Sequence, residues 1–251
     1  MVNALDLCHA GGMEAKGVVK NARERVKEAV SADIAAEARR QLAEVGAGAL
    51  SLRAVARELG MASSAMYRYF ASRDDLLTTL IVEAYDALGT VAETAALGGG
   101  TGFARWQRVC RAIRTWALEH PHEYVLLYGS PVPGYHAPPV TLVPASRVTL
   151  VLAGLIADAY AAGELEPADG AALPRAVAAQ VKPVAELVMP GVPLATVAQA
   201  LLVWAQLFGQ ISFELFDRFA GIVEDPEVLF DHAMSTMAKQ LGLRAPRAAR
   251  A

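Results

Sequence analysis

The sequence lacks the residue patterns that usually carry catalysis or metal binding. Its 251 residues include two cysteines, Cys8 and Cys110, and no CxxC pair, so no zinc site or thioredoxin-like site is predicted. No GxSxG, HExxH or phosphate-loop motif occurs. His120, His122 and Glu123 lie close together, but this spacing is typical of a polar helix end. We therefore expect no enzyme, no cofactor and no metal.

Signals for membranes and export are also missing. No uninterrupted apolar run reaches the roughly 18 residues that a membrane span needs. The N-terminus has no basic region followed by an apolar block, so no signal peptide is predicted. The composition, 54% hydrophobic and 20% charged, is enough to bury a core. We expect a cytoplasmic protein without a membrane partner.

The net charge of −3 argues against a general nucleic-acid coat, but the charge is unevenly distributed. Residues 14–79 hold eleven lysines and arginines against nine acidic residues, a balance of +2, whereas residues 80–251 hold twelve against sixteen, a balance of −4. A weakly basic head on an acidic body suits docking of one end on DNA.

Between Leu50 and Leu77 the pattern predicts two short helices joined by a tight turn. In the first, Val55, Ala56 and Leu59 share one face. Ser51 precedes this helix, where its hydroxyl can cap a free N–H, and Gly60 follows it, where a left-handed residue can end it.

The second helix of this pair is polar, aromatic and cationic on its outer side. Met66 and Phe70 are expected to face inward, while Ser63, Ser64, Tyr67, Arg68 and Tyr69 face solvent. Such a surface fits the major groove of DNA. Spacing alone also allows a plain helical hairpin with an exposed face.

The combination of three segments is more specific. The stretches LSLRAVARELG, AMYRYF and SRDDLL resemble the DNA-binding signature of the TetR/AcrR family of bacterial transcriptional regulators, over about residues 25–80. The resemblance implies a three-helix helix-turn-helix domain that binds double-stranded DNA.

By motif position, the resemblance also assigns DNA contacts. Ser51, Arg53, Tyr67, Tyr69 and Arg73 are expected to touch the phosphate backbone. Ser63, Ser64 and Ala65 open the recognition helix, where short side chains can read base edges. Arg68 contacts either a guanine or a phosphate.

The remainder of the chain also reads as helical, so the fold class is all-α. Helices are expected at residues 21–44, from Ser72 to before Leu97, and at 103–120, 147–163, 169–188, 194–219 and 226–241. Pro183 predicts a kink or break within its segment. Residues 130–144 carry five prolines and are expected to form a rigid loop, either a surface connector or a wall or lid of a ligand chamber.

The stretch WALEHP from Trp116, followed by Tyr128-Gly129, resembles the start of a WHG-like C-terminal domain of the same family. That family's C-terminal domain usually encloses an effector pocket. A small, largely apolar effector is therefore expected, and the candidate lining residues are Trp106, Cys110, Tyr124, Tyr128, Phe208 and Ser212.

Residues 194–219 are apolar on more faces than one body can cover, which favours a homodimer joined through this helix and residues 226–241. The resulting expectation is a ligand-responsive repressor that binds a palindromic operator. The alternative is a helical small-molecule carrier without DNA readout. The predicted organisation is a disordered leader at 1–19, a DNA-binding domain at 20–80, an effector and dimerisation domain at 81–243 and a basic tail at 244–251.

Overall fold

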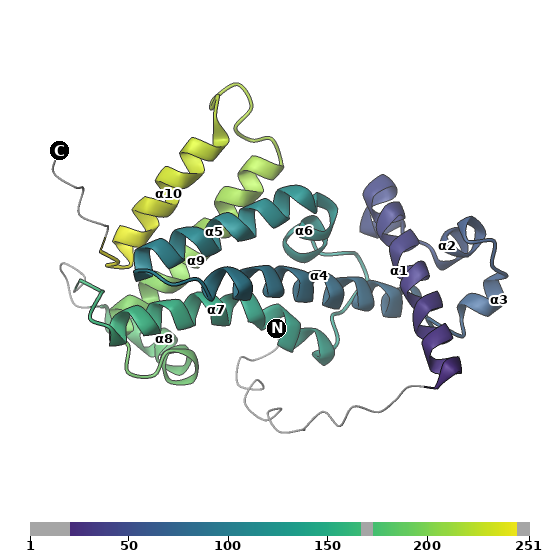
Figure 1. Ribbon diagram of the computed structural model, residues 1–251, viewed down its shortest axis with the longest axis horizontal. Coiled ribbons are helices and arrows are strands. Elements are labelled where there is room, and N and C mark those ends of the chain that lie inside the picture. The colour runs from purple at the N-terminus through teal and green to yellow at the C-terminus, as the bar shows by residue number, and fades with distance from the viewer. Residues whose placement is uncertain (1–20, 167–172, 245–251) are drawn as a thin grey trace. The chain divides into compact units, whose positions relative to one another are not determined.

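The computed structural model describes residues 21–166 and 173–244, and these residues form helices and connecting turns (Figure 1). Within them no strand forms, and an isolated β-bridge joins Leu165 to Leu243. The prediction of an all-α fold is therefore confirmed. The predicted leader at 1–19 and the tail beyond Arg244 lie outside the described residues.

The chain packs as two compact units. The first runs to Asp86 and includes His120–Pro144; the second comprises Ala87–Glu119 and the chain from Ala145 onward. Helix α4 (Arg73–Ala96) contributes to both units. Packing thus groups His120–Pro144 with the N-terminal helices, whereas the sequence placed it in the second domain. A functional boundary near residue 80 stays a prediction.

The first unit contains α1 (Ala22–Ala49), α2 (Leu52–Glu58), α3 (Ser63–Met66), the first part of α4, and α6 (Pro121–Tyr128). Asn21 caps α1 through a capping box with Glu24, which the sequence analysis missed. Side chains of α1 are buried only from Ile34 onward, and Val26 is 62% exposed. Gly46 has φ 73° and interrupts the helix near its predicted end.

The proline-rich segment belongs to the first unit. Val132 and Tyr135 pack against the helix-turn-helix core, and the Tyr135 hydroxyl lies 3.0 Å from that of Thr78. A 3₁₀ turn at Pro139–Thr141 leads directly into α7 (Leu142–Ala161). The expectation of a loop through Pro144 was therefore wrong at its end. Pro144 fits the first turn of α7, where no backbone N–H is required.

The second unit contains α5 (Gly102–Glu119), most of α7, α8 (Arg175–Val188), α9 (Leu194–Leu215) and α10 (Pro226–Gln240). Helix α9 packs against α5, α8 and α10, and α10 also packs against α5. Helix α8 continues through Pro183 without a break.

Helix α9 ends four residues before the predicted Phe219. Asp217 takes the left-handed conformation at φ 56°, and the N–H of Arg218 donates to the carbonyl of Phe213 at 2.8 Å. This is a Schellman C-cap made without glycine, and so the sequence carried no stop signal.

Two helices are long and apolar enough to cross a membrane by length and composition. They are Pro139–Ala161 and Leu194–Leu215, with mean hydropathies of 1.8 and 1.4. Polar or charged residues interrupt both segments, so neither forms the uninterrupted apolar run that would have predicted a membrane span. Both helices contribute buried residues to the second unit, which gives their apolar character a role in the core.

A largely buried ion pair joins α5 to α9. The guanidinium of Arg114 donates from Nε and Nη2 to both oxygens of Glu214, at 2.8 and 2.6 Å. The side chains are only 13% and 10% exposed. One turn earlier, Arg111 makes a similar bidentate pair with Asp231, with side chains 53% and 35% exposed.

We expect Arg114→Ala to lower the free energy of unfolding by roughly 2–4 kcal/mol, because it leaves the Glu214 carboxylate buried and unpaired. Urea unfolding measures this. The matched control, Arg111→Ala, should cost about 1 kcal/mol or less, since solvent screens its pair. Arg111 lowers the pKa of Asp231, so that contribution is present at neutral pH and is lost as the pH falls through the lowered pKa. Equal costs for the two variants at pH 7 would contradict this ranking.

Candidate DNA-binding surface and apolar pocket

The turn between α2 and α3 is closed by Gly60. It has φ 63°. Its N–H donates to the backbone carbonyl of Arg57, and the N–H of Met61 donates to the backbone carbonyl of Ala56. These two bonds form a Schellman motif, so the predicted helix stop at Gly60 is confirmed. Ala56 is fully buried under the turn.

Helix α3 is short because its hydrogen bonds tighten after Met66. The N–H groups of Arg68 and Tyr69 bond to carbonyls three residues back, and the turn continues to Phe70. Met66 is fully buried and Phe70 is 6% exposed, which confirms their predicted inward orientation. Both belong to one core cluster with residues of α1, α2 and α4.

The structure leaves the other side of this turn open to solvent. Arg53 on α2 is exposed, as are four residues of the α3 region: Ser63, Ser64, Tyr67 and Arg68. Ala65 is half-buried. The Tyr67 ring is 50% exposed, which is high for an aromatic residue in a small domain. Together they present hydroxyls, one aromatic ring and two guanidinium groups on one polar surface.

Three predicted phosphate contacts differ in their surroundings from what the sequence suggested. Ser51 is the N-cap residue of α2, but its hydroxyl makes no capping bond, so the predicted side-chain cap was wrong. Tyr69 is half-buried and packs against the core cluster rather than facing solvent alone. Their roles toward DNA remain predictions.

Arg73, the third, has a structural role that the sequence did not reveal. Its Nε donates to the carbonyl of Leu50 at 3.0 Å, and its Nη2 donates to those of Ala47 and Gly48 at 2.6 and 3.1 Å. The first turn of α4 is thereby tied to the segment that links α1 to α2. These carbonyls lie at a helix end, where they have no helical partners.

Arg73→Ala should lower the free energy of unfolding by about 2–3 kcal/mol, because three carbonyls lose a charged donor at once. Chemical denaturation followed by circular dichroism measures the change. Arg53→Ala is the matched control: that side chain is exposed and makes no hydrogen bond, so the expected change is within about 0.5 kcal/mol. Unchanged stability of Arg73→Ala would show that the three bonds do not hold the segment.

The predicted ligand-contacting residues fall in different places. Trp106, Cys110, Phe208 and Ser212 lie in the second unit, and the first three are buried. Tyr124 and Tyr128 lie in the first unit, where their ring centroids are 5.1 Å apart with the rings tilted by 40°, and Tyr128 also meets Tyr85 edge-on. The structure therefore assigns the six residues to two units, which spacing could not indicate.

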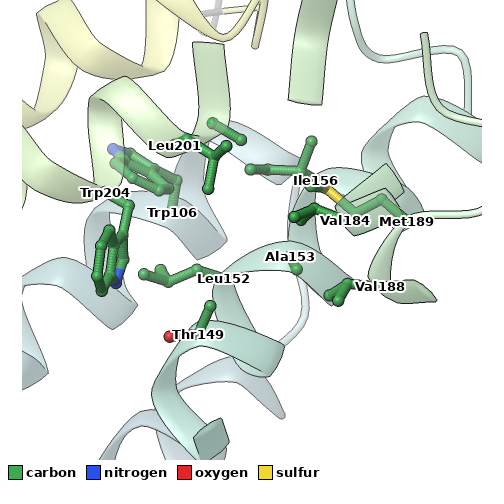
Figure 2. Close-up of a pocket in the computed structure, with 11 residues that line it drawn as sticks. Trp106, Thr149, Leu152, Ala153, Ile156, Val184, Val188, Met189, Leu201 and Trp204 are labelled. Atoms are coloured by element: carbon green, nitrogen blue, oxygen red, sulfur yellow. The ribbon is translucent and has the colours of Figure 1, made fainter. Parts of the chain in front are cut away.

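An apolar pocket opens in the second unit between α5, α7, α8 and α9 (Figure 2). It is lined by eleven residues, of which Trp106 alone was among the predicted ones. The others include Leu152 and Ile156 of α7, Val188 of α8 and Trp204 of α9. Trp204 was the missed residue with a detectable signal, because it is a tryptophan in a long and strongly apolar helix.

Burial changes the pKa of two titratable groups among these residues. Burial raises the pKa of the Cys110 thiol well above its ordinary value, so the sulfur stays protonated and unreactive. Burial likewise raises the pKa of the Tyr128 hydroxyl. His120 pairs through Nδ1 with Glu123 at 2.8 Å. Among the residues that the structure describes, no group of histidine, cysteine or acidic side chains is arranged to hold a metal.

A helix-turn-helix with a buried core below and a polar, cationic surface above defines a DNA-binding regulator. Residues 34–80 match the family model for bacterial regulatory proteins of the tetR family, and residues 106–237 match that for the tetracyclin repressor-like C-terminal domain. The chain belongs to the TetR family of transcriptional regulators. The WHG-like subtype stays a prediction.

Known proteins agree with this assignment. The HTH-type transcriptional regulator Rv1816 of Mycobacterium tuberculosis is 41% identical over 216 residues, which span 83% of this chain and 91% of the relative. The solved structure of the regulatory protein SCO4313 is 34% identical, covers 87% of this chain and 100% of its own, and has a TM-score of 0.72. A tetR-family protein from Rhodococcus RHA1, 17% identical with a TM-score of 0.60, shares the fold.

Proposed function

We propose that this DNA-binding regulator is a homodimeric repressor, which binds a palindromic operator and releases it when a small, largely apolar effector binds the second unit. The observation that carries the DNA-binding part is the exposed surface of α2 and α3. A small-molecule carrier, the alternative, would have no use for two exposed arginines and an exposed tyrosine there. We further propose that the protein has no catalytic activity and acts in the cytoplasm, without a membrane partner.

The proposed division of labour on DNA follows side-chain length and charge. Arg53, Tyr67 and Tyr69 would bind phosphates, as would Ser51 and any free donor of Arg73. Ser63, Ser64 and Ala65 are short enough to let α3 approach the bases, and a hydroxyl can bond with either donors or acceptors. Arg68 would reach a guanine or a phosphate.

The experiment for DNA binding uses a gel-shift titration with the DNA upstream of the protein's own gene, repeated over a range of salt concentrations. Arg53→Ala should weaken binding to all sequences alike and reduce the slope of log K against log salt by about one unit, because one phosphate contact is lost. Arg175→Ala, exposed at the start of α8 in the second unit, is the control and should leave the slope unchanged. An unchanged slope in Arg53→Ala would remove this residue from the interface.

The dimer proposal is supported by an exposed apolar stripe on α9. Leu202, Phe213 and Phe216 are 58%, 55% and 41% exposed, and Gly209 is exposed between them. Residues seven apart drift by only about 20° around a helix, so Leu202, Gly209 and Phe216 follow one line. Val228 on α10 is 65% exposed as well. Large apolar side chains at these levels of exposure mark a surface that a partner covers.

We therefore expect two copies of α9 and α10 to form a four-helix interface, burying on the order of 2,000 Å² or more in total. The two-fold axis would set the recognition helices about 34–36 Å apart, in successive major grooves.

Phe213→Glu should convert the dimer to a monomer at micromolar concentration, because it buries a charge in an apolar interface. Sedimentation velocity measures the mass. Val177→Glu, at an apolar position of α8 that is 40% exposed, is the control and should stay dimeric. A wild-type mass near that of one chain would refute the dimer, and a dimeric Phe213→Glu variant would move the interface elsewhere.

A further inference from the structure

We propose that the apolar pocket of the second unit binds an uncharged, mainly aliphatic or aromatic molecule that carries one hydrogen-bonding oxygen. This inference rests on the proposed function in that such a molecule would be the effector. The pocket's lining contains no lysine, arginine, histidine, aspartate or glutamate. Valine, leucine, isoleucine, alanine and methionine side chains supply most of its wall.

The size of the pocket limits the ligand. The volume open to the centre of a water molecule is about 60 Å³, and the empty space between the lining atoms is about 460 Å³ when open solvent at the mouth is included. A single water needs only about 10–15 Å³, and a drug-sized ligand needs at least about 300 Å³. The pocket therefore has room for several water-sized groups, such as a ring or a short alkyl chain, and a larger molecule would extend into its mouth.

The polar groups of the pocket gather at one side. Figure 2 shows Trp106, Thr149 and Trp204 on one side of the space, and Val184, Val188 and Met189 on the other. The indole N–H of Trp106 is already satisfied, because it donates to the carbonyl of Met234 at 3.0 Å. In the described part of the chain, the Thr149 hydroxyl and the Trp204 indole N–H have no hydrogen-bond partner.

Trp204 lines the pocket from the core side of α9. It lies two residues after Leu202, which is about 200° around the helix from the apolar stripe. That direction is the core side, where Leu207 and Ile211 are fully buried, yet Trp204 is 39% exposed. A core-facing tryptophan with free surface indicates space beside it that the chain itself does not fill.

These features select the head group of the ligand. An indole N–H is a donor only, and a threonine hydroxyl can donate or accept, so an oxygen that accepts a bond suits both. An alcohol, ketone or ester provides one. A carboxylate would lie beside an apolar wall without a cation, and an ammonium group would lie there without an acid, and both are costly to bury.

A matched pair of probes tests whether the pocket prefers an uncharged ligand to a charged one. 1-Octanol and octanoate have the same chain length, and neither absorbs where tryptophan fluoresces. Two of the protein's three tryptophans line the pocket, so intrinsic fluorescence reports occupancy without DNA. We expect saturable binding of 1-octanol and at least tenfold weaker binding of octanoate at pH 7. From 1-butanol to 1-octanol the affinity should rise about fourfold for each methylene that enters the pocket. Equal or tighter binding of octanoate would overturn the proposal.

Variants then locate the site by calorimetric titration. Ala153→Leu on α7 adds bulk to the wall of the pocket and should weaken 1-octanol at least tenfold, whereas Ala161→Leu, an exposed position on the same helix, should leave it unchanged. Thr149→Val keeps the shape and removes the hydroxyl, and Trp204→Phe removes the indole N–H together with one ring; each should weaken 1-octanol about two- to tenfold. Unchanged affinity in a folded Ala153→Leu variant refutes the site. If that variant does not fold, unchanged affinity in both of the other two refutes it.

The same probes separate this inference from the proposed function. If fluorescence shows that 1-octanol binds but a gel shift shows no release of DNA, the pocket is upheld and effector-driven release by this ligand class is refuted. DNA binding without any saturable binding of 1-octanol would uphold the regulator and refute the pocket chemistry.

Discussion

The burial of Met66 and Phe70 against α1, α2 and α4 is the contact on which the DNA-binding surface depends. Helix α3 has too few residues to be stable alone, so its orientation comes from these two side chains. Once they are buried, Ser63, Ser64 and Tyr67 must face outward. The Schellman turn at Gly60 and the small side chain of Ala56 make this packing possible, because they bring α2 and α3 close together.

Around this core, charged side chains hold the helices in register. Arg73 joins α4 to the α1–α2 segment, and Arg39 on α1 pairs with Glu83 of α4 and with Glu123 of α6. Tyr135 of the proline-rich segment packs against the same core cluster, and its hydroxyl is hydrogen-bonded to that of Thr78. The first unit is therefore more than a three-helix head, since α6 and the segment after it are built into its core.

In the second unit, α9 serves two purposes on opposite faces. Its stripe from Leu202 to Phe216 is the proposed dimer surface, and Trp204, on the far side, lines the pocket. If both proposals hold, a ligand in the pocket and a partner subunit would contact opposite faces of the same helix. The Arg114–Glu214 pair fixes the C-terminal part of that helix to α5. Occupancy of the pocket could thus change the dimer geometry with no contact between ligand and partner.

The sequence alone determined the all-α class, the helix-turn-helix and its inward residues Met66 and Phe70, because these follow from helical period, glycine placement and local motif. Tyr69, which was expected to face solvent, packs against the core cluster instead. It also located most helix ends within two residues. It missed the end of α1, the start of α7 and the end of α9 by four or five residues, and at the end of α9 a non-glycine residue takes the left-handed conformation. The tertiary structure alone decided what Arg73 binds, that 120–144 packs with the first unit, and which residues line the pocket. Each of these depends on contacts between residues far apart in the chain, and a local pattern carries no information on which distant partners meet.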